Sequence, residues 1–170
     1  MIATKDSTFE ERAKAPRVEE IACEKFYKSQ KCIIEKWGWD LLHKNNRGKF
    51  MHHMPDLISD TPDFWATTHD YKLQIMVEAK QIKAHGICFA MKVTHWEAYK
   101  KWFKLMGELA DFYFFFYNKS YGSINAPFHA VKNIIDNDSE IDTIDTGEYN
   151  EKKIHRFSVR GLEEYNVKRF

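Results

Sequence analysis

A Pro-Asp pair, followed 15 residues later by a glutamate at the end of an apolar run, constrains this chain more than any other feature of its sequence. The stretch is 61–80, TPDFWATTHDYKLQIMVEAK. Its second half alternates apolar and polar residues with the period of a β-strand, and it ends with Glu78, Ala79 and Lys80. Burying a charge is costly unless another charge pairs with it. The stretch therefore predicts either a self-neutralising pair or a site that receives a third charged species.

The same stretch predicts an antiparallel hairpin. Strands over 64–66 and 71–82 are joined by a short polar segment, Thr67-Thr68-His69-Asp70. Successive side chains of a strand point to opposite faces, so Glu78 and Lys80 share one face while Ala79 and Gln81 lie on the other. Asp63 then begins the partner strand. A second Pro-Asp pair ends at Asp56, which is interpreted as a turn residue because no strand-like run follows it.

The rest of the chain predicts an α/β domain. Before the hairpin we expect a helix over 17–29, with Val18, Ile21, Ala22 and Phe26 on its apolar face, and a strand within 32–42. After the hairpin we expect a strand over 87–93, a helix from a Thr94/Glu97 capping box to Gly107, and an aromatic strand over 112–117 that is buried on both faces. The chain then predicts a strand reaching Val131, an acidic loop over 136–151, and a final strand and helix within 154–167. The order αβββαβ, with extra C-terminal strands and a helix, predicts a central mixed sheet flanked by helices. One domain over 16–170 would follow a flexible arm over 1–15.

Composition excludes several classes of protein. The 170 residues carry 26 basic and 25 acidic side chains, so a nucleic-acid partner would have to meet a local basic patch. The three cysteines form no CxxC pair, which excludes a zinc knuckle or a disulfide framework and favours a reducing, intracellular setting. The first residues lack the apolar core of a signal peptide, and no apolar run is long enough to span a bilayer.

Two carboxylates on adjacent strands are suited to a hard divalent cation. Asp63 and Glu78 supply oxygen ligands of the kind that Mg²⁺ (or Mn²⁺) prefers, and the backbone carbonyl of Ala79 would add a third. Lys80 would orient a metal-bound water and stabilise charge on a phosphate. The alternative is an exposed Glu78–Lys80 pair on an edge strand, with Asp63 capping a turn.

The pattern Pro62-Asp63 followed by Glu78-Ala79-Lys80 resembles the PD-(D/E)XK nuclease superfamily. The resemblance covers about 17–118 and is nearest in style to small phage-type and junction-resolving nucleases. It implies a restriction-endonuclease-like fold and Mg²⁺- or Mn²⁺-dependent hydrolysis of phosphodiester bonds in DNA, in recombination, repair, or phage or virus DNA processing. A glutamate of the first helix often adds a metal contact in this superfamily. Glu19 takes this position here, with Glu20 as its competitor.

Further residues are candidate contacts to DNA, either duplex or branched. Gln81 follows the lysine, as is common in the superfamily, and would touch the edge of the site. Basic side chains that would meet phosphates are Lys44, Arg47 and Lys49 in a polar loop, and Lys100 and Lys104 on a helix. A solvated basic surface is the alternative for both groups. The resemblance also allows a homodimer, and places the protein in a cytoplasm (that of the host if it is viral). The rival function is a nucleic-acid-binding module without chemistry.

Overall fold

The computed structural model describes residues 17–37, 60–82, 88–145 and 151–170. The predicted arm over 1–15, Asp56 and the basic loop with Lys44, Arg47 and Lys49 lie outside the described residues.

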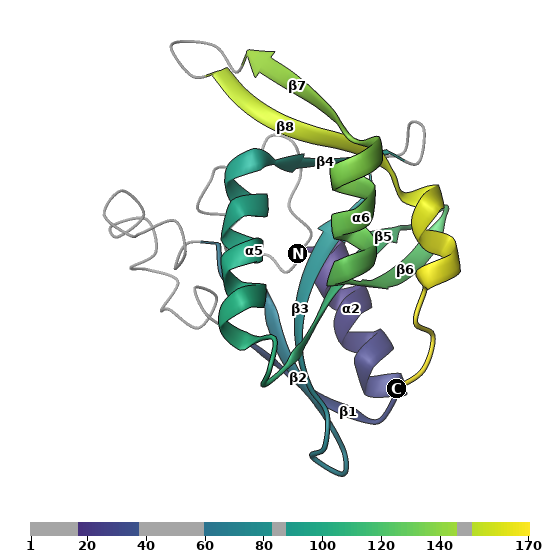
Figure 1. Cartoon of the computed structure of the whole chain (residues 1–170). Coiled ribbons are helices and arrows are strands. Elements are labelled where there is room, and N and C mark those ends of the chain that lie inside the picture. Colours follow the sequence, from purple (N-terminus) through teal and green to yellow (C-terminus); the bar gives the residue numbers. More distant parts are fainter. Residues whose placement is uncertain (1–16, 38–59, 83–87, 146–150) are drawn as a thin grey trace, which may run out of the picture.

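A five-stranded mixed sheet forms the centre of the fold (Figure 1). Its strands lie in the order β1-β2-β3-β5-β6: β1 is Cys32–Lys36, β2 is Phe64–Thr68, β3 is Gln74–Gln81, β5 is Asp111–Asn118 and β6 is Gly122–Pro127. β3 and β5 run parallel, and the other neighbours are antiparallel. The predicted hairpin is therefore confirmed as β2–β3, and β3 is a central strand rather than an edge.

The turn of this hairpin lies a few residues later than predicted. β2 continues to Thr68, whose N–H donates to the carbonyl of Leu73 at 3.1 Å. Between them, Asp70 accepts hydrogen bonds from the Thr68 hydroxyl and the Lys72 N–H, and Tyr71 adopts a left-handed φ of 57°. An aspartate that bonds the backbone two residues on is a common way to close such a turn.

A second, three-stranded sheet has the order β4-β8-β7, with β4 at Cys88–Lys92, β7 at Glu140–Asp145 and β8 at Glu151–Ser158. All its pairings are antiparallel. The predicted acidic loop over 136–151 is therefore wrong in part, because 140–145 forms β7. Glu140 of β7 lies opposite Arg156 of β8 in the register, and Asp142 pairs with Arg156 at 2.9 Å. Arg156 therefore offsets part of the acidic charge of β7.

Helices cover both faces of the central sheet. α2 (Val18–Ser29) packs on one face, while α5 (Val93–Met106) and α6 (Phe128–Asp138) lie on the other. Alternate residues of β3 enter different cores: Val77 joins the cluster with α2, and Met76 joins the cluster with α5. The aromatic strand is buried on both faces, as predicted, with Phe114 in one cluster and Phe115 in the other.

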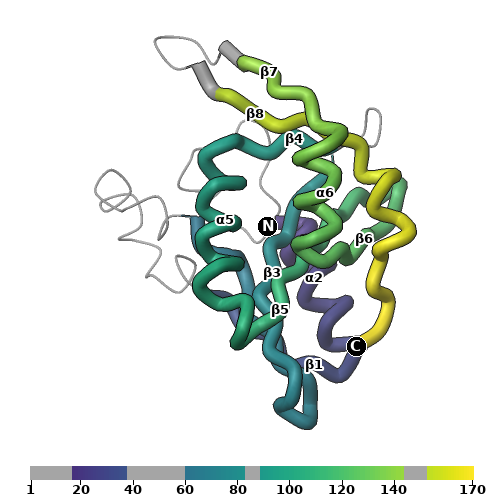
Figure 2. Tube along the Cα trace, in the orientation of Figure 1, coloured from purple at the N-terminus to yellow at the C-terminus, as the bar shows by residue number. Residues whose placement is uncertain are grey.

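The C-terminal segment passes from the 3₁₀ helix η2 (Val159–Tyr165) to α2 (Figure 2). Val167 donates its N–H to the carbonyl of Asn125 at 2.8 Å. Phe170 stacks on Tyr27 with ring centroids 5.3 Å apart. The segment therefore covers the open edge of β6 and closes the core beneath α2.

Three predictions about helices are corrected by the structure. The fully buried face of α2 carries Glu19, Glu20, Cys23 and Tyr27, whereas all four residues of the predicted apolar face are half-buried and only Ala22 and Phe26 of them pack against the core. α5 begins at Val93 directly after β4, so Thr94 and Glu97 lie inside the helix and form no capping box. The predicted strand reaching Val131 ends at Pro127, where α6 begins.

The predicted end of α5 at Gly107 is confirmed. The glycine is needed there for close approach and not for a left-handed conformation, since its φ is −63°. A Cβ atom at this position would lie 2.6 Å from the carbonyl oxygen of Phe103. No helix in the described part of the chain has the length and apolar character that crossing a membrane requires.

Candidate active site

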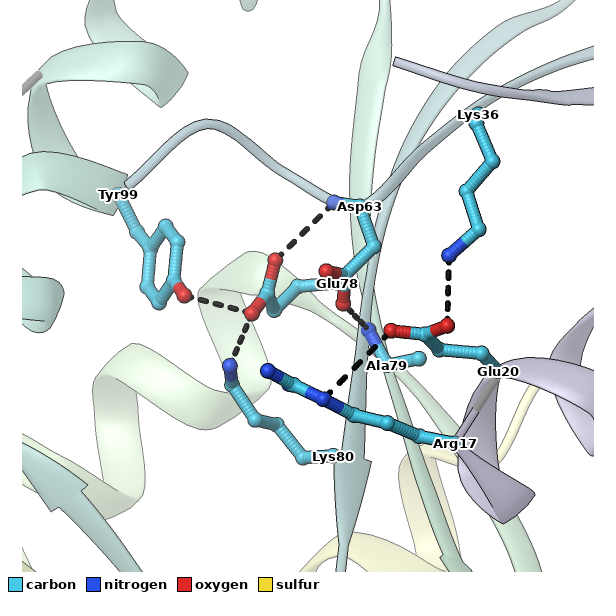
Figure 3. A network of polar contacts seen from close by, with 8 residues as sticks. All are labelled: Arg17, Glu20, Lys36, Asp63, Glu78, Ala79, Lys80 and Tyr99. Carbon is cyan, nitrogen blue, oxygen red and sulfur yellow. Dashed lines mark hydrogen bonds and ion pairs between the residues drawn. The ribbon is translucent and has the colours of Figure 1, made fainter. Parts of the chain in front are cut away.

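The candidate site lies where β2 and β3 separate. Their pairing ends at Phe64 and Val77, and β3 continues alone on that side to Gln81. The Ala79 N–H points into the opening, and Asp63 Oδ2 accepts a hydrogen bond from it at 2.9 Å (Figure 3). The backbone N–H of Asp63 donates in turn to Glu78 Oε2 at 3.2 Å. The two carboxylates predicted to act together are therefore side by side.

Lys80 and a tyrosine of α5 hold the other oxygen of Glu78. Tyr99 Oη donates to Glu78 Oε1 at 2.6 Å, and the Lys80 ammonium donates to the same oxygen. The Lys80 Nζ also lies 5.6 Å from the centroid of the Tyr99 ring. Glu78 is 2% exposed, so the alternative of an exposed pair on an edge strand is wrong. A buried carboxylate with three donors is firmly oriented.

Burial and charge shift the pKa values of these groups. Burial, followed by the neighbouring Glu78 carboxylate, raises the pKa of Asp63 well above its usual range. Burial alone would lower the pKa of Lys80, but Glu78 and Asp63 outweigh it and the Lys80 pKa lies above its usual value. Burial also raises the pKa of Tyr99 well above its usual value, so its hydroxyl is a donor at neutral pH. An ionised Asp63 is therefore costly until a cation lies beside it.

The first turn of α2 brings two glutamates to the site. Both are buried, with Glu19 6% and Glu20 8% exposed. Glu20 is engaged by Lys36, whose Nζ lies 2.8 Å from Oε2, and more loosely by Arg17, whose Nε lies 3.8 Å from Oε1. Burial raises the pKa of Glu19, and the positive charges of Arg17 and Lys80 oppose this rise. Glu19 forms no ion pair with another described residue, so it is the more available of the two.

The donor set is suited to a hard cation. Among the described residues, no three His, Cys, Asp or Glu side chains lie close enough together to hold a metal ion by themselves. Mg²⁺ commonly takes one or two carboxylates and completes its shell with waters, so Asp63 and Glu78 meet its usual demand. The C=O and N–H of one residue in an extended strand point to the same edge, so the Ala79 carbonyl opens toward Asp63.

The other predicted contacts are not part of this cluster. Gln81 is exposed and lies on the opposite face of β3 from Lys80. Lys100 on α5 pairs with Glu97 at 2.7 Å, and Lys104 is exposed further along the same helix. Contact of these side chains with DNA stays a prediction.

Sequence reasoning missed Tyr99 and Arg17. Tyr99 stands among the aromatic residues of α5 and has no motif of its own, but a buried tyrosine hydroxyl needs a hydrogen-bonding partner, and Glu78 is that partner. Arg17 stands just before α2, and its charge acts on Asp63, Glu20, Glu19 and Glu78. Its signal in the sequence was the lack of a capping side chain at the start of a helix, where serine, threonine, asparagine or aspartate is preferred.

Comparison with known proteins finds similarity at the level of structure. No protein-family model matches the sequence, and no curated protein matches it. Among solved structures, the chain is similar to Hjc, a Holliday junction resolvase from Archaeoglobus fulgidus, with a TM-score of 0.50 and 10% sequence identity. The similarity covers 88% of this chain and 95% of that chain. The two proteins share a fold. The predicted fold class, a central mixed sheet flanked by helices in a restriction-endonuclease-like core, is thereby confirmed.

Proposed function

We propose that this protein is a divalent-cation-dependent deoxyribonuclease of the PD-(D/E)XK type. The observation that supports this most strongly is the joining of Asp63 to Glu78 and Ala79 by two hydrogen bonds at the open edge of β3. A buried cluster of carboxylates beside a lysine costs stability, and such clusters are typical of functional sites. The contacts among Asp63, Glu78, Ala79 and Lys80 support this proposal.

The residues take separate roles in this proposal. Asp63, Glu78 and the Ala79 carbonyl would hold Mg²⁺ or Mn²⁺, and Glu19 would support the site from α2. The bound ion would polarise the phosphodiester and lower the pKa of a bound water. The Ala79 N–H fixes the orientation of Asp63, and Tyr99 fixes that of Glu78. Lys80 orients the attacking water and stabilises the negative charge that develops on the phosphate.

Branched DNA is the substrate that the structural similarity favours. The neighbour Hjc is described as a Holliday junction resolvase, and its chain is matched over 95% of its length. A four-way junction presents two equivalent strands, so a homodimer with two such sites would suit it. We extend both features to this chain as part of the proposal, together with a role in recombination or repair and an intracellular location.

Cleavage assays test this function directly. The protein is incubated with a four-way junction, linear duplex, single strands and supercoiled plasmid, each in Mg²⁺, Mn²⁺ or EDTA. We expect cleavage of the junction in Mg²⁺ or Mn²⁺ and none in EDTA. Binding of the junction without cleavage in any cation would instead support the rival function, a nucleic-acid-binding module on the same fold. Cleavage that persists in EDTA would contradict the metal requirement.

A further inference from the structure

Arg17 stands at the candidate site, where its charge acts on the surrounding carboxylates, but its local backbone position does not favour an arginine. It is the residue before the first turn of α2, in an extended conformation, and its side chain makes no capping hydrogen bond. A positive charge at a helix N-terminus is unfavourable, because the helix macrodipole places partial positive charge there. A residue that violates two local preferences at a site is expected to have a functional reason for its presence.

The structural role that Arg17 does have is weak. Its only ion pair with another described residue joins Nε to Glu20 Oε1 at 3.8 Å, near the limit for such a contact. Glu20 is already held by Lys36 at 2.8 Å. The Arg17 side chain is 62% exposed, and exposed pairs of this kind contribute little to stability. The guanidinium therefore has no strong ion pair with another described residue.

The direction of the side chain is informative. Arg17 extends from α2 across the site toward Lys80 and Glu78 (Figure 3). Its charge acts on both groups, and it opposes the protonation of Lys80. Two cations that face the same opening repel each other, and an anion between them would remove this repulsion. A guanidinium offers a planar fork of donors that matches two oxygens of a phosphate.

We propose that Arg17 binds a non-bridging oxygen of the substrate phosphodiester. This inference rests on the proposed function, and it adds a second substrate-binding cation to Lys80. Arg17 would act mainly on binding, because it is exposed and is not hydrogen-bonded to the carboxylates of β3. Lys80 would act mainly on the chemical step.

The test compares Arg17→Ala and Arg17→Lys with Lys28→Ala. Lys28 is a matched control, since it lies on the same helix, has a side chain that is also 62% exposed, and pairs with Glu24 at 3.8 Å. Binding of a four-way junction is measured in Ca²⁺ over a range of salt concentrations, and cleavage is measured in Mg²⁺. We expect Arg17→Ala to weaken binding about tenfold and to lower the salt slope by about one unit. Arg17→Lys should bind more tightly than Arg17→Ala but less tightly than the wild-type protein, because lysine keeps the positive charge but lacks the planar pair of N–H donors.

The outcomes separate this inference from the proposed function. If the wild-type protein cleaves the junction while Arg17→Ala and Lys28→Ala both bind and cleave as it does, the role of Arg17 is wrong and the nuclease assignment stands. If the wild-type protein neither binds nor cleaves DNA, both proposals are wrong. Circular dichroism and a thermal melt of each variant establish that it is folded. If Arg17→Ala is unfolded, Arg17→Gln is measured in its place against the same expectations.

Discussion

Tyr99 of α5 donates a hydrogen bond of 2.6 Å to the Oε1 atom of Glu78, the carboxylate of the central strand β3. The tyrosine is 2% exposed, and its ring packs edge-on against Phe112 and Phe114. A buried side chain of α5 therefore orients a carboxylate of the candidate site. This contact links the packing of α5 to the geometry of a proposed metal ligand.

Replacement of Tyr99 by phenylalanine tests this link. Tyr99→Phe removes the donor but keeps the ring, so the core should remain packed while Glu78 loses one of its three partners. We expect the cleavage rate to fall about tenfold, which corresponds to about 1.4 kcal/mol, with DNA affinity unchanged. Tyr113→Phe is the matched control, because Tyr113 is half-buried and packs on the opposite face against Phe170. Equal rates for the two variants would show that the hydrogen bond has no role in cleavage.

Lys80 is predicted to act on chemistry rather than on binding. Lys80→Ala should reduce cleavage by about a hundredfold or more and leave junction affinity within about tenfold. The protein should remain folded, since Glu78 keeps its bonds to Tyr99 and to the Asp63 N–H. Lys72→Ala is the control, because Lys72 is an exposed lysine in the turn of the same hairpin. Full cleavage by folded Lys80→Ala, with contaminating nuclease excluded, would end the assignment of the site.

We expect His155, which lies outside the candidate site, to make the stability of the protein depend on pH. Burial lowers its pKa; Lys100 also lowers it, whereas Glu97 and Asp136 oppose the shift. As the pH falls, His155 is therefore protonated in the unfolded chain before it is protonated in the folded protein. The free energy of unfolding should decrease as the pH falls below about 6.5 toward the pKa of His155 in the folded protein.

Denaturant unfolding between pH 7.5 and pH 5 measures this effect. The wild-type protein should lose stability more steeply than His155→Gln, which carries no titrating group at this position. His129→Gln is the control, since His129 is exposed on α6. Identical slopes for the wild type and His155→Gln would contradict the assigned direction of the shift.

The sequence predicted those parts of the site that depend on strand periodicity. A period of two fixes which residues of β3 share a face, so Glu78 and Lys80 were correctly placed together. The Pro-Asp pair before Phe64 correctly placed Asp63 at the start of β2, beside Glu78. The aromatic strand was recognised because a short continuous run of six aromatic residues favours a strand covered on both faces.

The sequence failed where tertiary contacts override local pattern. The apolar period of 17–29 favoured a face with Ile21, Ala22 and Phe26, yet Glu20 is buried in the first turn, where Lys36 of β1 pairs with it. Lys36 and Tyr99 are distant from these partners in sequence, so no local motif could reveal the contacts. Similarly, β7 pairs with β8 along its whole length, and this long-range pairing is not visible in the acidic sequence of 140–145.

Calcium binding tests the proposed metal ligands without turnover. Burial raises the pKa of Asp63 above its unfolded value, so in the metal-free protein the stability that depends on this group declines as the pH rises from about 4 through the folded pKa. A bound cation favours the ionised carboxylate and should reverse this decline. At pH 8, a Ca²⁺ concentration 100 times the Kd should stabilise the wild-type protein by about 2.7 kcal/mol.

Asp63→Asn separates these two effects in one thermal-melt experiment. The variant has no buried ionised carboxylate at this position, so without cation it should melt above the wild-type protein at pH 8. It also lacks a charged ligand, so the stabilisation by Ca²⁺ should fall to a small fraction of the wild-type shift. Asp111→Asn is the control, because Asp111 is an exposed aspartate at the start of β5 and should change neither value. An equal Ca²⁺ shift in the wild type and Asp63→Asn, supported by calorimetric titration, would exclude Asp63 as a metal ligand.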